Sequence, residues 1–514
     1  MPTLEQRSSG VLLHPSSLPG PHGIGDIGHE AFAFADFLAA CGQTWWQMLP
    51  VGPCGQGHSP YFSSSAFAGN PLLLSLEKLC QQGLLEPADI KPLRGLSKDR
   101  VHYSAVENFK APRLRKAFEA FESNPEHALQ KDFSAFCAER RVWLDDHALF
   151  GALKQTHQGK AWMDWEPALR ARQSEALAAA RQSLASSIRY HQFLQFLFHR
   201  QWGELREYCR SLGLGLIGDI PIFVAGDSAD VWAHPELFWL DADGRPTVVS
   251  GVPPDYFSQK GQLWGNPLYR WDVMRQDGYS WWAARLRATR ERFDAVRLDH
   301  FIGFHNYWEI PAGAQDAVAG RWVPGPGEDF FRVILGALEK IEIIAEDLGM
   351  LTPEVAALRD KFAFPGMRIL QFCFGEWDER HQPHKFPRRC VAYTGTHDND
   401  TTAGWFHDPG GRSSTRTPEQ IRVERENALR YLGTNGMEIH WDMIHSALKS
   451  PAHTVIILAQ DLLGLDGKAR MNLPGTVEGN WQWRLRPGTL TAEVAGRLAL
   501  MTGAYGRGPR RWTL

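Results

Sequence analysis

Short apolar segments recur along the chain, separated by turn residues and by longer polar stretches. Their near-continuous apolarity predicts β-strands that are covered on both faces, as in parallel sheets. Eight such strands are expected, at Val11–Leu13, Trp45–Val51, Leu214–Ile222, Asp294–Leu298, Ile341–Ala345, Met367–Phe372, Val391–Thr394 and Val455–Leu458. Helical patterns lie between many of them, for example at Glu30–Ala40, Trp281–Arg292 and Phe330–Leu338. Strands that alternate with helices predict an α/β fold, and eight of them favour a closed (β/α)8 (TIM) barrel over an open doubly wound sheet.

The second and third predicted strands are separated by a long segment, residues 72–211, that is rich in helix-forming residues. Helices are expected at Ala111–Glu122, Ala128–Thr156 and Glu166–Cys209. No Ser/Gly-rich linker frames the segment, and no low-complexity tract or internal repeat interrupts the chain. We therefore expect one catalytic barrel domain, residues 1–514, that carries residues 72–211 as a helical insertion subdomain.

A second insertion, residues 225–280, follows the third predicted strand and has a different character. It is rich in Pro, Gly and aromatic residues and shows little periodicity. Long irregular loops in compact domains are usually lids or binding loops. Because the segment follows a strand, it should rise from the C-terminal face of the barrel, where barrel enzymes have their active sites. We expect a loop-rich insertion that covers the active site.

Composition excludes several classes of partner. The 514 residues include 55 Lys+Arg and 58 Asp+Glu, so the formal net charge of -3 provides no footprint for nucleic acid and no polybasic membrane patch. No segment approaches the ~20 apolar residues that span a bilayer, and the N-terminus has no signal-peptide pattern. The seven cysteines are scattered and never form a CxxC pair, so we expect neither a disulfide framework nor a zinc site. These features predict a cytoplasmic protein.

Acidic residues follow several of the predicted strands. Asp299 follows the fourth and Glu346 the fifth, the seventh runs into His397-Asp398, and the third contains Asp219 near its end. A single acid after a strand is ordinary loop chemistry. Acids at the same end of neighbouring parallel strands converge on one mouth of the barrel, which indicates an active site there.

Strand parity assigns roles to two of these acids. Arg297 and Asp299 share one face of a strand, so an inward guanidinium would favour the ionised form of Asp299. The like charge of Asp299 should in turn raise the pKa of Glu346, leaving it able to protonate a leaving group. Glycoside cleavage with retention uses such a pair of carboxyl groups, one ionised and one protonated, ~5 Å apart. Asp398 would then hold sugar hydroxyls and stabilise the positive charge that develops on the ring.

Rival motifs are weaker. Residues 23–28 match GxGxxG, but no acid follows the second strand to bind a ribose, so a turn that enters a helix is the better interpretation. Residues 397–400, His-Asp-Asn-Asp, lack a partner set of histidines at metal-ligand spacing, and no metal is expected. The chain contains neither a GxSxG elbow nor a P-loop.

Several motifs together resemble the amylomaltases, also called 4-α-glucanotransferases or disproportionating enzymes, of the α-amylase clan. The resemblance extends from about residue 13 to residue 484. Its most specific segments are Ser59-Pro-Tyr, Ser65-Ala-Phe-Ala-Gly-Asn-Pro, Gly218-Asp-Ile-Pro-Ile, Gly251-Val-Pro-Pro-Asp-Tyr-Phe, Gln262-Leu-Trp-Gly-Asn-Pro, Arg297-Leu-Asp-His, Ala345-Glu-Asp-Leu-Gly and Gly395-Thr-His-Asp-Asn.

The resemblance implies that Asp299 is the nucleophile, Glu346 the general acid/base and Asp398 the transition-state stabiliser. It implies substrate-binding roles for Tyr61, Asp219, Asp255, Gln262, Trp264, Arg297, His397 and Asn472. It further implies that the enzyme uses no cofactor and does not need calcium. The expected partners are maltooligosaccharides and α-1,4-glucans, and the expected state is a monomer or a weak homo-oligomer.

Two alternatives to a transferase remain open on the sequence. An α-glucan hydrolase would share the first chemical step and would differ only in admitting water to the intermediate. A catalytically inactive carbohydrate-binding barrel is disfavoured because all three acids are present. The covering insertion and Trp264 favour a transferase, because a covered aromatic groove limits the access of water.

Overall fold

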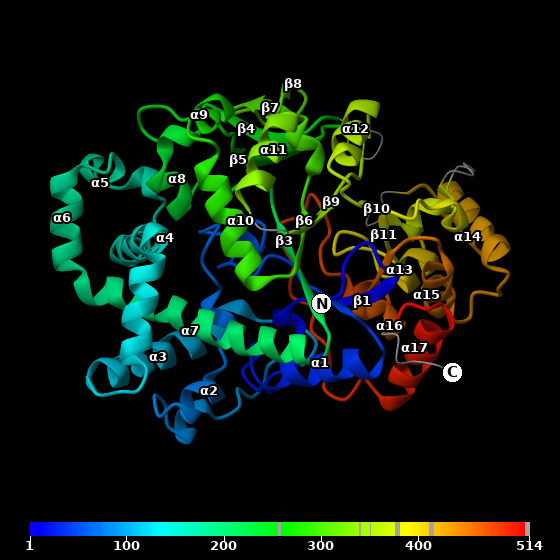
Figure 1. Ribbon diagram of the computed structural model, residues 1–514, viewed down its shortest axis with the longest axis horizontal. Helices are drawn as coiled ribbons and strands as arrows, with labels where there is room; N and C mark the ends of the chain where they lie inside the picture. Colours follow the sequence, from blue (N-terminus) through cyan, green and yellow to red (C-terminus); the bar gives the residue numbers. More distant parts are fainter. Residues whose placement is uncertain (255–258, 339–340, 350, 376–380, 411–415, 509–514) are drawn as a thin grey trace.

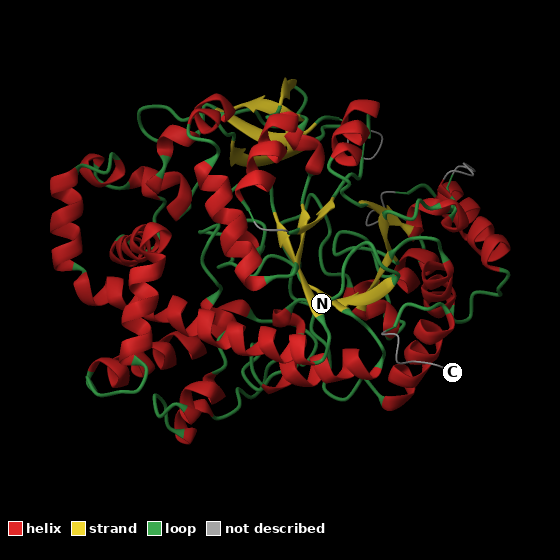
Figure 2. Ribbon diagram, in the orientation of Figure 1, coloured by secondary structure: helices red, strands yellow, loops and turns green. Residues whose placement is uncertain are grey.

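The barrel contains the eight strands that the apolar segments predict. The computed structural model describes residues 1–254, 259–338, 341–349, 351–375, 381–410 and 416–508. Within these residues one eight-stranded parallel sheet has the order β10-β11-β12-β1-β2-β3-β6-β9. Its strands are β1 (Ser8–Leu12), β2 (Trp45–Gln47), β3 (Gly215–Ile220), β6 (Ala295–Leu298), β9 (Glu342–Ala345), β10 (Gly366–Ile369), β11 (Cys390–Tyr393) and β12 (Thr454–Leu458). They curve around the centre of the molecule (Figures 1 and 2). The (β/α)8 barrel is confirmed.

Two strands end three or more residues before their predicted ends. β2 ends at Gln47 although the apolar run continues to Val51, and the run contains Pro50, which has no N–H to donate to a neighbouring strand. β10 ends at Ile369, and the rest of its apolar run forms a 3-10 helix, Leu370–Cys373. Apolarity marks burial in both cases, and backbone pairing ends sooner than burial does.

A buried carboxylate closes the barrel between β9 and β10. The N–H of Ala345 donates to the carbonyl of Pro365 (2.9 Å), and the N–H of Met367 donates to Oδ1 of Asp347 (2.7 Å). Gly366 is required beside it, because a Cβ there would lie 2.3 Å from Oδ2 of Asp347. Asp347 is therefore committed to the wall of the barrel, and its neighbour Glu346 is the acid left for the mouth.

The segment at residues 72–211 is helical, as expected. It contains α2 (Leu76–Gln81), α3 (Tyr103–Glu122), α4 (Gln130–Thr156), α5 (Pro167–Arg170), α6 (Ser174–Ser183) and α7 (Ala185–Ser211). The helix predicted over Glu166–Cys209 is broken into three, with Arg172 at a left-handed φ of 53° between α5 and α6. α7 leads into β3 and packs Trp202 against Phe293, which precedes β6, at 5.4 Å between ring centroids. The end of this helical segment is thus part of the barrel's outer layer, and α7 runs below the centre of the molecule in Figure 1.

The segment at residues 225–280 is more regular than predicted. It contains α8 (Ala229–Ala233), β4 (Val248–Val252), β5 (Gln262–Pro267) and α9 (Trp271–Gln276). β4 and β5 join β7 (Asn306–Pro311) and β8 (Arg321–Pro324) in a four-stranded antiparallel sheet of order β5-β4-β7-β8. The sequence did not indicate this sheet because its two halves come from different connections, after β3 and after β6. It lies at one end of the molecule, at the top in Figure 2.

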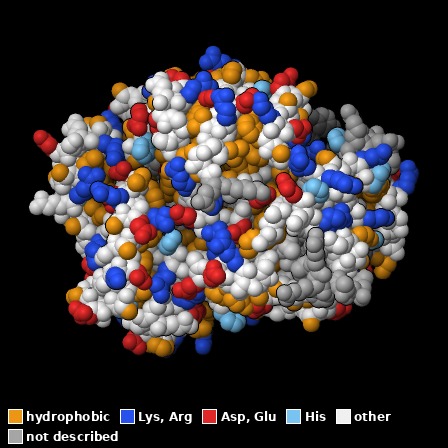
Figure 3. Space-filling model, viewed as in Figure 1, with side chains coloured by type: hydrophobic (Ala, Val, Ile, Leu, Met, Phe, Trp, Pro, Cys, Tyr) orange, Lys and Arg blue, Asp and Glu red, His pale blue; other side chains and the backbone are white. Residues whose placement is uncertain are grey.

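The remaining α-helices belong to the connections between barrel strands and to the C-terminal part of the chain. They are α1 (His29–Ala40), α10 (Ser280–Arg292), α11 (Gly327–Ala337), α12 (Pro353–Lys361), α13 (Thr402–His407), α14 (Pro418–Leu432), α15 (Ile439–Lys449), α16 (Ala459–Leu462) and α17 (Ala492–Ala504). Gly28, the last glycine of the GxGxxG match, is the N-cap of α1, in agreement with a turn that enters a helix. No helix among the described residues has the length and apolarity needed to cross a membrane. On the face shown in Figure 3, acidic and basic side chains are interspersed.

Candidate active site

The predicted catalytic acids lie at the C-terminal ends of barrel strands. Asp219 is within β3, Asp299 follows β6 directly and Glu346 follows β9 directly. β3, β6 and β9 are neighbours in the sheet, and Asp219 is in register with Arg297. Asp398 lies on the loop after β11. Parallel pairing therefore sets three acidic strand ends side by side.

Arg297 bridges two of the acids. Its Nη2 lies 2.8 Å from Oδ1 of Asp299, and its Nη1 donates to both carboxylate oxygens of Asp219, at 2.8 and 2.9 Å. Burial opposes its charge, but Asp219 and Asp299 outweigh burial and raise the pKa of Arg297 well above its usual value. The predicted geometry is confirmed: residues 297 and 299 point to the same side, and a fixed cation lies against Asp299.

Glu346 is the acid with the raised pKa. Its Oε2 accepts the N–H of His300 (2.7 Å), next to Asp299, and its Oε1 accepts the N–H of Leu348 (2.9 Å). Burial raises the pKa of Glu346 to about 7; Asp299 adds to the increase, while Arg297 opposes it. The direction is as predicted, but the main cause is burial and not the like charge.

His300 has an unusual backbone conformation that serves this contact. Its φ of 51° is in the left-handed region, which non-glycine residues rarely adopt. The same residue donates the N–H that Glu346 accepts. Strained residues of this kind persist where the surrounding structure enforces them, and they concentrate at functional sites.

Asp398 is held as an anion by two side chains. Nδ2 of Asn472 donates to its Oδ1 (2.6 Å), and Nε2 of His397 lies 3.3 Å from its Oδ2. Burial acts against both charges, but the ion pair prevails, so the pKa of Asp398 lies well below its usual value and the pKa of His397 lies above its own. Asn472 attracted attention only through the family resemblance, and the structure gives it a direct contact with Asp398.

Tyr61 connects the two sides of the site. Its hydroxyl donates to Oδ2 of Asp219 (2.8 Å), and its ring stacks on His397, with 5.0 Å between centroids. Burial raises the pKa of Asp219 to about 6, against the effect of Arg297. These contacts join residues on the loop after β2, on β3 and on the loop after β11.

The predicted substrate-binding residues Gln262 and Trp264 belong to β5. Nε1 of Trp264 donates to Oε1 of Gln262 (3.2 Å), and the Trp264 ring meets the ring of His300 edge to face at 4.8 Å. The antiparallel sheet therefore reaches the residue that follows Asp299. Asp255 lies outside the described residues.

Three residues around Asp398 were missed by the sequence reasoning. Trp481 contacts the rings of Tyr61 and His397, at 5.6 and 5.8 Å between centroids. Arg470 donates to the backbone carbonyl of Asp398. Asp461, in α16 directly after β12, accepts the hydroxyl of Thr394 (2.6 Å) and the N–H of Thr402 (2.7 Å), one at each end of the loop that carries Asp398. Of these three residues, only Asp461 carried a signal in the sequence, because it is an acid shortly after a predicted strand.

Replacing Asp461 by Asn is expected to lower the free energy of unfolding by about 1–3 kcal/mol, because one buried donor then faces an amide N–H2 in place of a carboxylate oxygen. Chemical denaturation measures this change, and kcat should fall with it as the Asp398 loop loses its anchor. Asp466→Asn is the matched control, because Asp466 is an exposed N-cap and Asn caps equally well. Equal stability of the two variants would contradict an anchoring role for Asp461.

The described groups define a class of protein. One carboxylate is paired with a buried arginine, and a second carboxyl group, with a raised pKa, lies against the backbone of the adjoining residue. A carboxylate ion-paired with arginine and a second carboxyl group with a raised pKa, at the mouth of a (β/α)8 barrel, define an enzyme that cleaves glycosidic bonds.

The chain belongs to the 4-alpha-glucanotransferase family, whose model matches residues 13–491. It is 48% identical over 510 residues to the 4-alpha-glucanotransferase of Thermus thermophilus, covering 98% of this chain and 99% of that one. It is 45% identical over 509 residues to that of Synechocystis sp., with the same coverage. The chloroplastic/amyloplastic 4-alpha-glucanotransferase of Solanum tuberosum is 43% identical and is covered to 87%.

A solved structure supports the same assignment. The amylomaltase of Streptococcus agalactiae in complex with acarbose superposes with a TM-score of 0.92 at 39% identity, covering 98% of this chain and 100% of that one. The amylomaltase of Corynebacterium glutamicum has a TM-score of 0.78 at 18% identity and shares the fold.

Proposed function

We propose that this chain is a retaining 4-α-glucanotransferase, which moves a segment of an α-1,4-glucan from a donor to the 4-hydroxyl of an acceptor glucose or maltodextrin. The observation that carries the proposal is the contrast between Asp299, ion-paired with Arg297 at 2.8 Å, and Glu346, whose pKa burial raises to about 7. The family assignment favours transfer over hydrolysis.

In the first step a carboxylate oxygen of Asp299 attacks the anomeric carbon of the donor. The bond from that carbon to the glycosidic oxygen breaks, and the oxygen takes the proton of Glu346 as the leaving chain departs. A glycosyl ester on Asp299 remains, and Glu346 is ionised. The ion pair with Arg297 supports this step because the guanidinium holds the attacking carboxylate of Asp299 in place, 2.8 Å from its Oδ1.

In the second step the ionised Glu346 takes the proton of an acceptor 4-hydroxyl. The acceptor oxygen attacks the anomeric carbon, the ester bond to Asp299 breaks, and both carboxyl groups return to their starting states. Two inversions give net retention. A pKa near 7 suits Glu346 to both tasks, because the group must donate and accept a proton at the same pH.

Asp398 and the surrounding side chains would bind the sugar that reacts. The low pKa of Asp398 keeps a negative charge where positive charge develops on the ring. The proposed substrate-binding residues are Tyr61, Asp219, Asp255, Gln262, Trp264, Arg297, His397 and Asn472. Hydrogen-bonded acids such as Asp219 suit sugar hydroxyls, while Trp264 offers an aromatic face for a sugar ring.

Exclusion of water would decide between transfer and hydrolysis. The edge-to-face contact of Trp264 with His300 supports a β5 strand that covers the reaction centre. A covered intermediate survives until a sugar hydroxyl, rather than water, is in position.

Incubation with maltotriose is expected to yield glucose and longer maltodextrins without a net gain in reducing ends. Chromatography of the products and a reducing-end assay measure the two quantities on one sample. A steady rise in reducing ends would instead support the α-glucan hydrolase, and no new products at all would support the inactive barrel.

We also propose a cytoplasmic location and a monomeric or weakly homo-oligomeric state. The seven cysteines, all within the described residues, are free thiols, which suits a reducing compartment. Light scattering across a dilution series measures the oligomeric state.

A further inference from the structure

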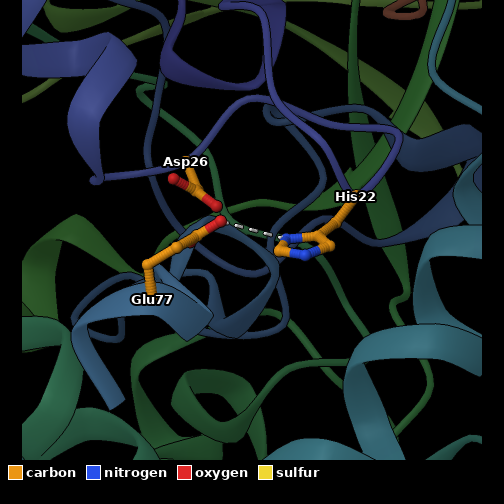
Figure 4. Close-up of side chains that lie close together, drawn as sticks. All are labelled: His22, Asp26 and Glu77. Carbon is orange, nitrogen blue, oxygen red and sulfur yellow. Dashed lines mark ion pairs between the residues drawn. The ribbon is translucent and has the colours of Figure 1, made fainter. Parts of the chain in front are cut away.

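A buried histidine and two carboxylates form a cluster on the loop before α1 and at the start of α2. His22 and Asp26 lie on the loop, and Glu77 lies in the first turn of α2. One side-chain ligand atom from each lies within 4.8 Å of the corresponding atoms of the other two (Figure 4). His22 is fully buried, whereas the Glu77 side chain is 39% exposed, so one side of the cluster is open to solvent.

The imidazole of His22 has one committed nitrogen and one without a partner. Nε2 lies 3.0 Å from the carbonyl oxygen of Ile90, so Nε2 is the nitrogen that carries the proton of the neutral ring. Nδ1 is buried and has no hydrogen-bond partner among the described residues. It faces Oε1 of Glu77 at 3.8 Å, as the dashed line in Figure 4 shows. Two electron-pair donors that face each other are stabilised by a proton or a cation between them.

The ring orientation of His22 is fixed by its surroundings. The imidazole stacks on Phe109 at 5.1 Å between centroids, and the Ile90 carbonyl holds Nε2. A metal-bound histidine characteristically donates its second ring N–H to a carbonyl or carboxylate in this way, which sets the tautomer and the direction of the lone pair.

The ammonium group of Lys110 pairs with Asp26 and does not reach the position between His22 and Glu77. The Nζ of Lys110 donates to the carbonyls of Leu72 (2.7 Å) and Leu74 (2.8 Å) and, at 3.4 Å, to Oδ2 of Asp26. Its three protons are thereby used, and its weakest contact is the one with Asp26. Among the described residues no Lys or Arg lies within 4.0 Å of the Glu77 carboxylate, so this carboxylate is left for a further cation.

We propose that His22 Nδ1, Asp26 and Glu77 bind one zinc ion, with water completing the coordination. One imidazole nitrogen and two carboxylates match the ligands of Zn²⁺, whereas Ca²⁺ takes oxygen ligands only. Small side-chain shifts bring the three atoms from within 4.8 Å of one another to the spacing of about 3–4 Å that ligands around one zinc adopt.

The ion would have a structural role. It links the loop of residues 13–28 to α2, and the same loop supports the segment next to the active site: Ser17 donates its hydroxyl to the carbonyl of Trp483 (2.8 Å) and accepts the N–H of Leu485 (2.7 Å). Zinc is therefore expected to raise the thermal stability of the protein without taking part in the reaction.

Isothermal titration of ZnCl2 into the full chain, without an affinity tag and after removal of metals, tests the proposal. We expect one zinc bound per chain, an increase in Tm with zinc, and no binding of CaCl2 under the same conditions. Glu77→Gln should weaken the zinc affinity by about 100-fold or more, since it removes one of three ligands. This variant should fold, because Glu77 is partly exposed and the buried Lys110–Asp26 pair is left intact.

The matched control is Glu30→Gln. His29 Nδ1 and Glu30 Oε1 lie 3.5 Å apart, but their side chains are 88% and 41% exposed, so they reproduce the pair without the buried cluster. The control should bind zinc as the wild type does. A wild-type chain that binds no zinc, or equal affinity in the wild type and Glu77→Gln, would overturn the proposal.

Discussion

Replacing Asp299 by Asn is expected to lower kcat on maltotriose by a factor on the order of 10⁴ to 10⁶, the scale seen when a covalent nucleophile is removed. The amide oxygen has no charge with which to displace the leaving chain. The fold should persist, because Arg297 keeps the carboxylate of Asp219 at 2.8 Å as its partner and Asn can still accept a hydrogen bond from the guanidinium. Product formation over hours, together with circular dichroism and a thermal unfolding curve, measures both effects.

The control for this variant is Asp272→Asn, an exposed acid in the first turn of α9. It removes the same charge from the chain without touching the site, and its activity should match that of the wild type. Transfer within tenfold of the wild type in Asp299→Asn would show that another group is the nucleophile.

The kcat/KM for maltotriose is expected to fall about tenfold per pH unit above about pH 7, because Glu346 must carry a proton to release the leaving chain. The direction of this pH dependence follows from the raised pKa of Glu346. Burial raises the pKa of Glu346 to about 7, so the active, protonated form predominates below that pH and is lost as the pH rises through it. Initial rates between pH 5 and 9, measured at low substrate concentration, determine this limb of the profile.

Glu346→Gln with α-maltosyl fluoride separates the two roles of Glu346. Fluoride leaves without protonation, so the variant should release one equivalent of fluoride rapidly, independently of pH above 7, and then stall because no base activates the acceptor. Mass spectrometry should find maltose on Asp299, and azide, an anionic nucleophile, should restore turnover.

The corresponding control is Glu354→Gln, at an exposed position in the first turn of α12, which should keep the wild-type profile. If Glu346→Gln retained the alkaline limb with the fluoride donor, Glu346 would not be the group that sets it.

The sequence predicted the site well where the argument was local. Parity along one strand placed Arg297 and Asp299 on the same side, and the structure joins them at 2.8 Å. The eight apolar runs predicted the eight barrel strands, because burial on both faces leaves a direct trace in composition. Strand ends were less accurate, as at Val51, since apolarity reports burial and does not report backbone pairing.

The structure was needed wherever distant segments meet. Asn472 binds Asp398 across 74 positions of the chain, and Tyr61 binds Asp219 across 158, distances over which no periodicity carries information. The antiparallel sheet that brings Trp264 to His300 is assembled from two separate connections. Its strands could not be paired from either connection alone.

The sequence by itself determined the barrel class, the identity of the acidic strand ends and the pairing of Arg297 with Asp299, because these follow from the two-residue repeat of a buried strand. The charge pattern also predicted the raised pKa of Glu346, but only the tertiary structure decided its main cause. Glu346 has its raised pKa chiefly because the folded chain excludes water from it, and Asp347 is withdrawn from the site because it closes the barrel through the N–H of Met367. The desolvation of a group depends on all the atoms packed around it, and a local sequence pattern does not contain this information.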